Sequence, residues 1–228
     1  LPGVTISDKY ARLQTLVARA KGLPPIDMAV VHPRDEASPN GAPLAAQHDV
    51  GMVSFAGATR AGKLVMKTAA DTVKKVALEL GGKSANILLD DADFPRMVKL
   101  GVLTLLTNSG QNCNAPSRML VPENRLDEVE AIAAAALAKV VVGDPLADST
   151  TMGPLANDAQ FRRVQQLIEL GIAEGAKLVA GGPGRPEGMA QGFFTRPTIF
   201  SRVTNAMTIA REEIFGPVLS ILPYRDED

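Results

Sequence analysis

The sequence contains no tryptophan, one cysteine, two histidines and two tyrosines among its 228 residues. A single cysteine, Cys113, excludes an internal disulfide framework, and such a chain is typical of a reducing compartment, so we expect a cytoplasmic protein. His32 and His48 are too few for a dedicated Cys/His zinc site, and no metal is expected.

The chain also lacks an excess of charge of either sign and a long apolar run. Its 24 Lys and Arg face 25 Asp and Glu, for a formal net charge of −1. This balance gives no indication of a nucleic-acid or membrane partner. No apolar run approaches the roughly 18 residues that a membrane-spanning helix needs. A composition that is 46% hydrophobic and 21% charged excludes disorder and predicts a soluble globular protein with a large core.

The two ends predict a piece of a longer chain. The sequence begins at Leu1-Pro2-Gly3 without a methionine or a signal-peptide pattern. It stops at Arg225-Asp226-Glu227-Asp228, directly after a strand-like run.

Apolar patterning predicts strands that alternate with helices. The strands are expected at 28–31, 50–56 (buried), 76–80, 85–89, 119–121, 177–180, 198–200 and 218–222. The helices are expected near 8–21, 63–70, 93–108, 126–140 and 161–172, with loops at 33–43 and 181–192. This alternation, with short connections, predicts an α/β fold of mostly parallel sheets covered by helices.

Cys113 is a candidate nucleophile. A lone cysteine is more often a small buried apolar side chain. This one lies in a polar turn that follows a long apolar helix, Asn108-Ser109-Gly110-Gln111-Asn112-Cys113-Asn114-Ala115-Pro116. Backbone N–H groups of such a turn can stabilise a thiolate and, later, an oxyanion.

Glu79 is the candidate general base. It ends an apolar strand and is followed by Leu80-Gly81-Gly82-Lys83-Ser84. The carboxylate is therefore expected at the carboxyl edge of a sheet, where α/β proteins place their sites. An isolated glutamate at that edge would more often be a solvated surface residue, but the paired glycines allow a ligand or backbone to approach closely.

A third segment, Gly57-Ala58-Thr59-Arg60-Ala61-Gly62-Lys63, has the glycine and lysine spacing of a phosphate-binding P-loop. Leu64 stands where a magnesium-binding Ser or Thr is required, so an ATPase is excluded. A strand, a glycine turn and a helix N-terminus remain, and these can bind a pyrophosphate.

Five segments together resemble the aldehyde dehydrogenase superfamily, from about Gly22 to Asp228. They are Phe55-Ala56-Gly57-Ala58-Thr59-Arg60-Ala61-Gly62, Glu79-Leu80-Gly81-Gly82-Lys83-Ser84, Gly110-Gln111-Asn112-Cys113, Gly192-Phe193-Phe194 with Pro197-Thr198, and Glu212-Glu213-Ile214-Phe215-Gly216-Pro217. The resemblance implies an NAD(P)-dependent oxidation of an aldehyde to a carboxylic acid.

The resemblance also implies the catalytic roles. Cys113 would attack the aldehyde as a thiolate to give a thiohemiacetal, and hydride would leave for the nicotinamide. Glu79 would then deprotonate the water that hydrolyses the thioester.

For the cofactor, NAD or NADP, the resemblance implies five contact residues. Gly57 and Gly62 match the nucleotide turn, Leu80 supplies a main-chain contact, Glu213 matches the residue that binds the nicotinamide ribose, and Phe215 packs beside the nicotinamide.

The resemblance implies that the chain is an internal segment of an aldehyde dehydrogenase with parts of two domains. Residues 1–80 would be the end of a partial Rossmann-type nucleotide-binding domain, and 81–228 a catalytic domain without its C-terminal end. The family is usually dimeric or tetrameric, so a homo-oligomer is expected for the full-length protein.

Several departures from the family pattern stand out. Ala58 occupies a position that is usually serine, which removes one pyrophosphate hydrogen bond. The lysine and acidic residue that bind the adenosine ribose should fall near Leu1 to Thr5 and are absent there, so the choice between NAD and NADP stays open. The asparagine of the oxyanion hole falls upstream of Leu1.

Two other functions stay open on the sequence. One is a non-catalytic remnant or structural subunit of the same fold. The other is a thiol esterase that acts through Cys113 without redox chemistry, although neither histidine lies in a motif typical of its base.

Overall fold

The computed structural model describes residues 41–226, and the chain divides into two compact units, Leu1–Leu80 and Gly81–Asp228. Each unit is described by itself. The helix expected near 8–21 and the strand expected at 28–31 lie outside the described residues. The α/β class is confirmed, because helices alternate with mostly parallel strands in both units.

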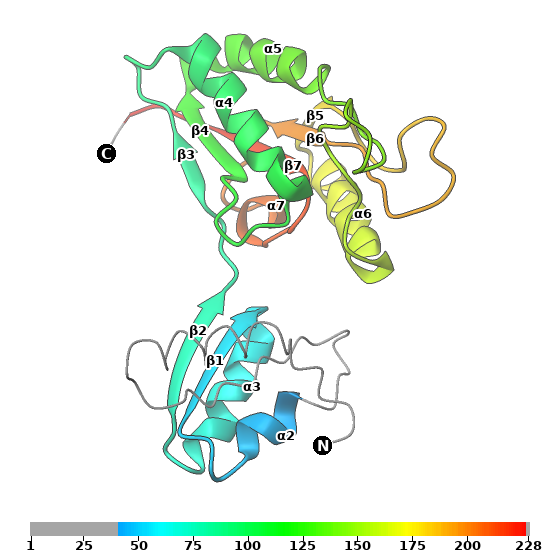
Figure 1. Ribbon diagram of the computed structural model, residues 1–228. Coiled ribbons are helices and arrows are strands. Elements are labelled where there is room, and N and C mark those ends of the chain that lie inside the picture. The colour runs from blue at the N-terminus through cyan, green and yellow to red at the C-terminus, as the bar shows by residue number, and fades with distance from the viewer. Residues whose placement is uncertain (1–40, 227–228) are drawn as a thin grey trace, which may run out of the picture. The chain divides into compact units, whose positions relative to one another are not determined.

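The first unit contains a parallel strand pair and a crossover helix (Figure 1). Strand β1 (Met52–Gly57) leads into helix α3 (Thr59–Ala70), which returns the chain to strand β2 (Lys75–Leu80). Gly62 lets α3 lie close to β2, because a Cβ there would come within 2.6 Å of the Leu80 Cδ2 atom.

Two expectations for this unit are wrong. Strand β1 was expected to be buried, but its residues are exposed or half-buried, because only one further strand pairs with it in the described residues. The loop expected at 33–43 is wrong at its end, because residues 41–43 belong to helix α2 (Gly41–Ala46). Pro43 is compatible with a helix there because it lies in the first turn, where no backbone N–H is needed.

The second unit is built on a five-stranded sheet with the order β3-β4-β7-β6-β5. Its strands are β3 (Ala85–Ile87), β4 (Arg118–Pro122), β5 (Lys177–Ala180), β6 (Thr198–Ser201) and β7 (Val218–Tyr224). All neighbouring pairs are parallel except β5 with β6, which is antiparallel.

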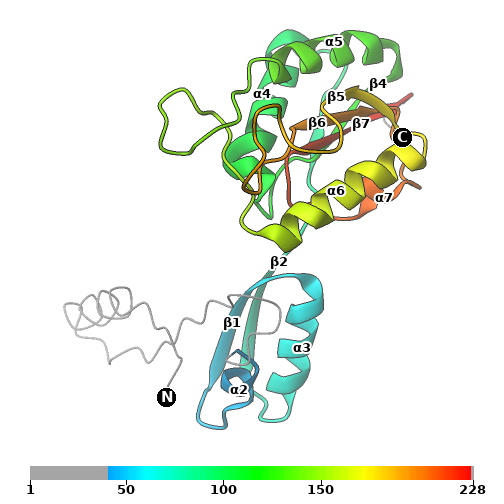
Figure 2. The same ribbon diagram turned by 90° about the vertical axis from the view of Figure 1, so that its right-hand side faces the viewer.

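Helices cover both faces of this sheet (Figure 2). Helices α4 (Phe94–Leu106) and α5 (Leu126–Leu137) pack on one face, and α6 (Asp158–Ala173) and α7 (Thr208–Arg211) pack on the other. Along β7, Leu219 and Ile221 belong to the first core, whereas Val218 and Leu222 belong to the second. This alternation follows from the two-residue period of a strand.

Local signals fix several helix ends. Asp93 caps α4 as expected, its side chain accepting the Arg96 N–H at 3.2 Å, and Pro95 lies in the first turn. Helix α4 ends at Leu106, where the 3-10 turn η1 (Thr107–Gly110) begins, and η2 (Glu123–Arg125) precedes α5. Among the described residues no helix is long and apolar enough to cross a membrane.

Candidate functional site

Cys113 lies in a tight turn that projects from the end of η1. The Ala115 N–H donates to the Asn112 carbonyl at 3.1 Å and closes the turn. The Asn112 side chain donates to the Thr107 carbonyl at 3.0 Å, which ties the turn to the end of α4. Cys113 is unpaired and exposed. A structural role in a core is thereby excluded, and the thiol is accessible to a substrate or a reagent.

Three consecutive residues before this turn adopt left-handed backbone conformations. The φ angles are +51° at Asn108, +58° at Ser109 and +74° at Gly110. For residues with a side chain this conformation costs of the order of 1–3 kcal/mol, and it persists only where the surroundings hold it. Ser109 is held by its hydroxyl, which donates to the Gly153 carbonyl at 2.9 Å. The reversal turns the chain sharply out of α4 and presents Cys113.

The paired glycines after Glu79 lie against two other motifs. A Cβ on Gly81 would collide with the Glu213 carboxylate, and a Cβ on Gly82 would come within 2.9 Å of the Cys113 carbonyl oxygen. The Gly82 N–H donates to Glu213 Oε1 at 3.3 Å. Three motifs that are far apart in the sequence therefore meet within the second unit.

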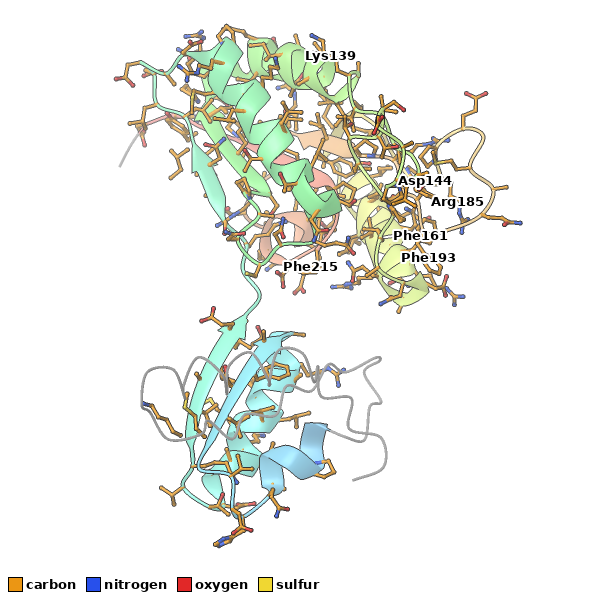
Figure 3. The ribbon with its side chains drawn as sticks, viewed as in Figure 1. Lys139, Asp144, Phe161, Arg185, Phe193 and Phe215 are labelled. Atoms are coloured by element: carbon orange, nitrogen blue, oxygen red, sulfur yellow. The ribbon has the colours of Figure 1, made fainter. Side chains whose placement is uncertain are left out.

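The turn that carries Phe215 completes this arrangement. A Cβ on Gly110 would collide with the Gly216 carbonyl, so the cysteine loop and the 212–217 segment touch through their backbones. Phe215 has a φ of +53° and its side chain is 38% exposed. Figure 3 shows this ring beside α7, away from Phe161 and Arg185.

A lysine with a buried Nζ atom lies next to these groups. The pKa of Lys83 is lowered to about 8 by burial and by the neighbouring Arg118 cation, while the Glu213 carboxylate opposes the shift. Arg118 Nη2 donates to the Lys83 carbonyl at 2.6 Å. The Glu213 carboxylate is thus close enough to Lys83 to interact with its charge.

The other predicted site residues lie in the first unit. Glu79 is the penultimate residue of β2 and is exposed, opposite Ala56 of β1. Gly57 ends β1 and Gly62 lies in α3, whose N-cap, Ala58, makes no side-chain cap hydrogen bond. That Glu79 acts on a thioester at Cys113 stays a prediction.

The site includes residues that the sequence analysis missed. Gln111 accepts the Ala156 N–H at 2.8 Å, and Gln160 donates to the carbonyls of Ile214 at 2.9 Å and Phe215 at 2.7 Å. These partners are 45, 54 and 55 residues away in the sequence, so no local pattern indicates them.

The arrangement offers groups that can contact a nucleotide cofactor. Among the described residues no three His, Cys, Asp or Glu side chains are grouped as metal ligands. A half-buried carboxylate beside two glycines can accept hydrogen bonds from sugar hydroxyls, and an exposed aromatic ring can cover a planar ring.

Comparison of the sequence with known proteins finds a matching family and similar proteins. A sequence model of the aldehyde dehydrogenase family matches residues 9–228. A 3-succinoylsemialdehyde-pyridine dehydrogenase from a Pseudomonas species is 61% identical over 188 residues, which are 82% of this chain and 39% of that protein.

Solved structures give the same result. A mutant of aldehyde dehydrogenase C from Pseudomonas syringae, in complex with NAD+ and octanal, superposes with a TM-score of 0.81 at 57% identity, over 82% of this chain and 38% of its own. A Mycobacterium tuberculosis aldehyde dehydrogenase in complex with NAD+ gives 0.78 at 44% identity, over 81% and 38%. The chain thus spans about two fifths of the length of these relatives.

Proposed function

This chain belongs to the aldehyde dehydrogenase family, and we propose that it carries the nucleophile, the general base and the nicotinamide-side contacts of an enzyme that oxidises an aldehyde to a carboxylic acid with NAD+ or NADP+. The observation that carries this proposal is the meeting of the Cys113 turn, the Gly81-Gly82 pair and Glu213 within one unit.

Cys113 begins the reaction. Its thiolate forms a C–S bond to the aldehyde carbon, and the carbonyl oxygen becomes an oxyanion. The backbone N–H of Cys113 is one donor for this oxyanion, and the exposed turn leaves room for the substrate. The backbone reversal at 108–110 fixes the thiol in position before the substrate arrives.

Glu213 and Phe215 would hold the cofactor. The carboxylate would accept hydrogen bonds from the hydroxyls of the nicotinamide ribose, while the ring of Phe215 would lie beside the nicotinamide. When bound, the cofactor supplies the hydride acceptor that converts the thiohemiacetal to a thioester. Leu80 would supply a main-chain contact beside the nicotinamide, and Gly57 and Gly62 would form the turn that contacts the rest of the nucleotide.

Glu79 completes the cycle as general base. It takes a proton from the water that attacks the thioester carbon, and the C–S bond breaks to release the carboxylic acid and free thiol. What supports this role is its place in the chain: Glu79 lies on β2, two residues before the glycine pair that contacts Glu213 and the Cys113 turn.

The test is to mix the purified protein with octanal and either NAD+ or NADP+ and follow the reduced cofactor. We expect Cys113→Ala to abolish all reduction, because no C–S bond can form. Glu79→Gln should keep a first-turnover burst but lose about 10²- to 10⁴-fold in steady-state rate, because thioester hydrolysis stalls. Glu187→Gln, an exposed glutamate in the 181–197 loop, serves as control.

Two results would contradict the proposal. Ester hydrolysis that is lost in Cys113→Ala, without cofactor reduction, would indicate a thiol esterase. Absence of both activities and of cofactor binding would indicate a non-catalytic protein of this fold.

A further inference from the structure

We propose that Gln160 is a positioning residue that holds the Ile214-Phe215 corner and thereby fixes Glu213 and Phe215 for cofactor binding. The inference rests on the proposed function, in which these two side chains contact the nicotinamide half of the cofactor.

The side-chain amide of Gln160 donates both of its hydrogen bonds to this corner. Nε2 donates to the Ile214 carbonyl at 2.9 Å and to the Phe215 carbonyl at 2.7 Å. An amide NH2 group has two donors, so the acceptor pair matches its full capacity. An apolar or anionic side chain of equal size could make neither bond.

The helix start fixes Gln160 independently of the corner. Asn157 caps α6, its side chain accepting the Gln160 N–H at 2.9 Å. Because Asn157 supplies the cap, the Gln160 side chain is not needed by the helix itself. Its two bonds therefore act on the 212–217 segment.

The corner requires such a restraint. Phe215 holds a left-handed backbone at φ +53°, a strained conformation for an aromatic residue. Gly216 packs so closely on α6 that a Cβ would come within 2.5 Å of Val164 Cγ2. Arg163 and Glu212 pair on the exposed side at 3.4 Å. The segment thus lies along the first two turns of α6, with Gln160 bound directly to its strained residue.

The same stretch of chain also holds the nucleophile loop. Gly153 accepts from Ser109 at 2.9 Å, and the Ala156 N–H donates to Gln111 at 2.8 Å. Residues 153–164 therefore connect the Cys113 turn with the Glu213 segment, and Gln160 provides the connection on the cofactor side.

Helix α6 offers a matched control. Gln165, one turn further along, also bridges to a loop: it donates to the Thr195 hydroxyl at 2.7 Å and accepts the Gly184 N–H. Its partners belong to the 181–197 loop, which Arg185 also fastens by stacking on Phe161 at 4.5 Å (Figure 3). Gln165→Met removes an equivalent pair of bonds without touching the 212–217 segment.

The experiment compares wild type, Gln160→Met, Gln160→Glu and Gln165→Met. Amide hydrogen exchange of peptides covering 212–217 should become about tenfold faster in both Gln160 variants and stay unchanged in Gln165→Met. The dissociation constant for NAD+, measured by calorimetry, should rise roughly tenfold in the Gln160 variants alone. Alkylation of Cys113 by iodoacetamide should keep its wild-type rate in all four proteins, because the side-chain hydrogen bonds of Gln160 and Gln165 go to other segments.

Failure of this inference and failure of the proposed function are distinguishable. Wild-type exchange and NAD+ affinity in both Gln160 variants would overturn the inference and leave the proposed function standing. A wild-type protein that binds neither NAD+ nor NADP+ would overturn the proposed function and with it the cofactor role of Gln160, while the exchange data would still decide whether Gln160 holds the corner.

Discussion

The surroundings of Lys83 make the free energy of unfolding depend on pH. Its Nζ atom is buried and has no hydrogen-bond partner among the described residues, and its pKa is lowered to about 8 from 10.5. Burial and Arg118 penalise the charged form more than Glu213 stabilises it. Between about pH 8 and pH 10.5, Lys83 is therefore protonated in the unfolded chain but largely deprotonated in the folded chain.

The sign of the pH effect follows from this difference. Between about pH 8 and pH 10.5 the unfolded state binds more protons at Lys83, so the free energy of unfolding should rise with pH through this site. We expect Lys83→Met to remove that rise and to increase stability at pH 7 by up to about 3 kcal/mol. Urea denaturation at several pH values, followed by circular dichroism, measures both effects.

Lys99→Met, an exposed lysine on α4, controls for the loss of a charge. The difference between the two variants also cancels the contribution of other groups that titrate in this range. An equal pH dependence in Lys83→Met and wild type would show that Lys83 is not destabilised in the folded state.

At the scale of elements, the connection from α4 through η1 to the Cys113 turn depends on Gly110. Gly110 combines a φ of +74° with a backbone contact, since its missing Cβ would collide with the Gly216 carbonyl. A flexible side chain could move aside, but two backbone segments cannot separate without displacing the loop.

Gly110→Ala should therefore lower the free energy of unfolding by more than about 2 kcal/mol and sharply reduce activity. Gly175→Ala is the matched control: Gly175 follows α6 with a φ of +88°, and nothing lies within 4 Å of its Cβ position. That substitution should cost only the backbone strain, about 1 kcal/mol, with activity retained. Thermal unfolding and steady-state rates would be measured for both variants. Equal losses of stability and activity in Gly110→Ala and Gly175→Ala would contradict a role for the Gly216 contact.

Elements with a strong local pattern were predictable from the sequence, and elements held by distant contacts were not. Strand β5 was expected at 177–180, where the structure has it, because its apolar residues lie between turn residues. Helix α7 was missed because it has only four residues. Its first turn is held by Glu174, the C-cap residue of α6, whose carboxylate accepts the Thr208 N–H at 2.7 Å. The antiparallel direction of β5 likewise depends on pairing rather than on pattern.

The candidate site divides in the same way. Cys113 and Glu79 were predicted from the glycines and polar residues around them, and Glu213 was predicted from the resemblance to the family. Gln160 and Ser109 were missed because they act through backbone carbonyls that lie far away in the sequence. Positioning residues of this kind become visible only when the chain is folded.

At the scale of the whole molecule, the two apolar cores formed by residues 41–226 both belong to the second unit. One core lies between the sheet and helices α4 and α5, and the other between the sheet and helices α6 and α7. All of their residues fall between Leu88 and Leu222. The described residues of the first unit include few buried side chains, such as Ala45 and Ala69.

The fragment 81–228 should therefore fold without the rest of the chain. We expect it to unfold cooperatively, with the same midpoint as the corresponding transition of the 228-residue chain, because every residue of these two cores is kept. Differential scanning calorimetry of the two proteins tests this expectation. A fragment without a cooperative transition would show that the second unit depends on the first.

The glycine pair at 81–82 has a consequence for protein engineering. The boundary between the two units falls directly before Gly81, yet the Cβ positions of both glycines point at Glu213 and the Cys113 carbonyl. A graft that replaces residues 1–80 must therefore keep Gly81 and Gly82 and place its junction before them. A linker inserted between these glycines would displace Gly81 from the Glu213 carboxylate or Gly82 from the Cys113 turn.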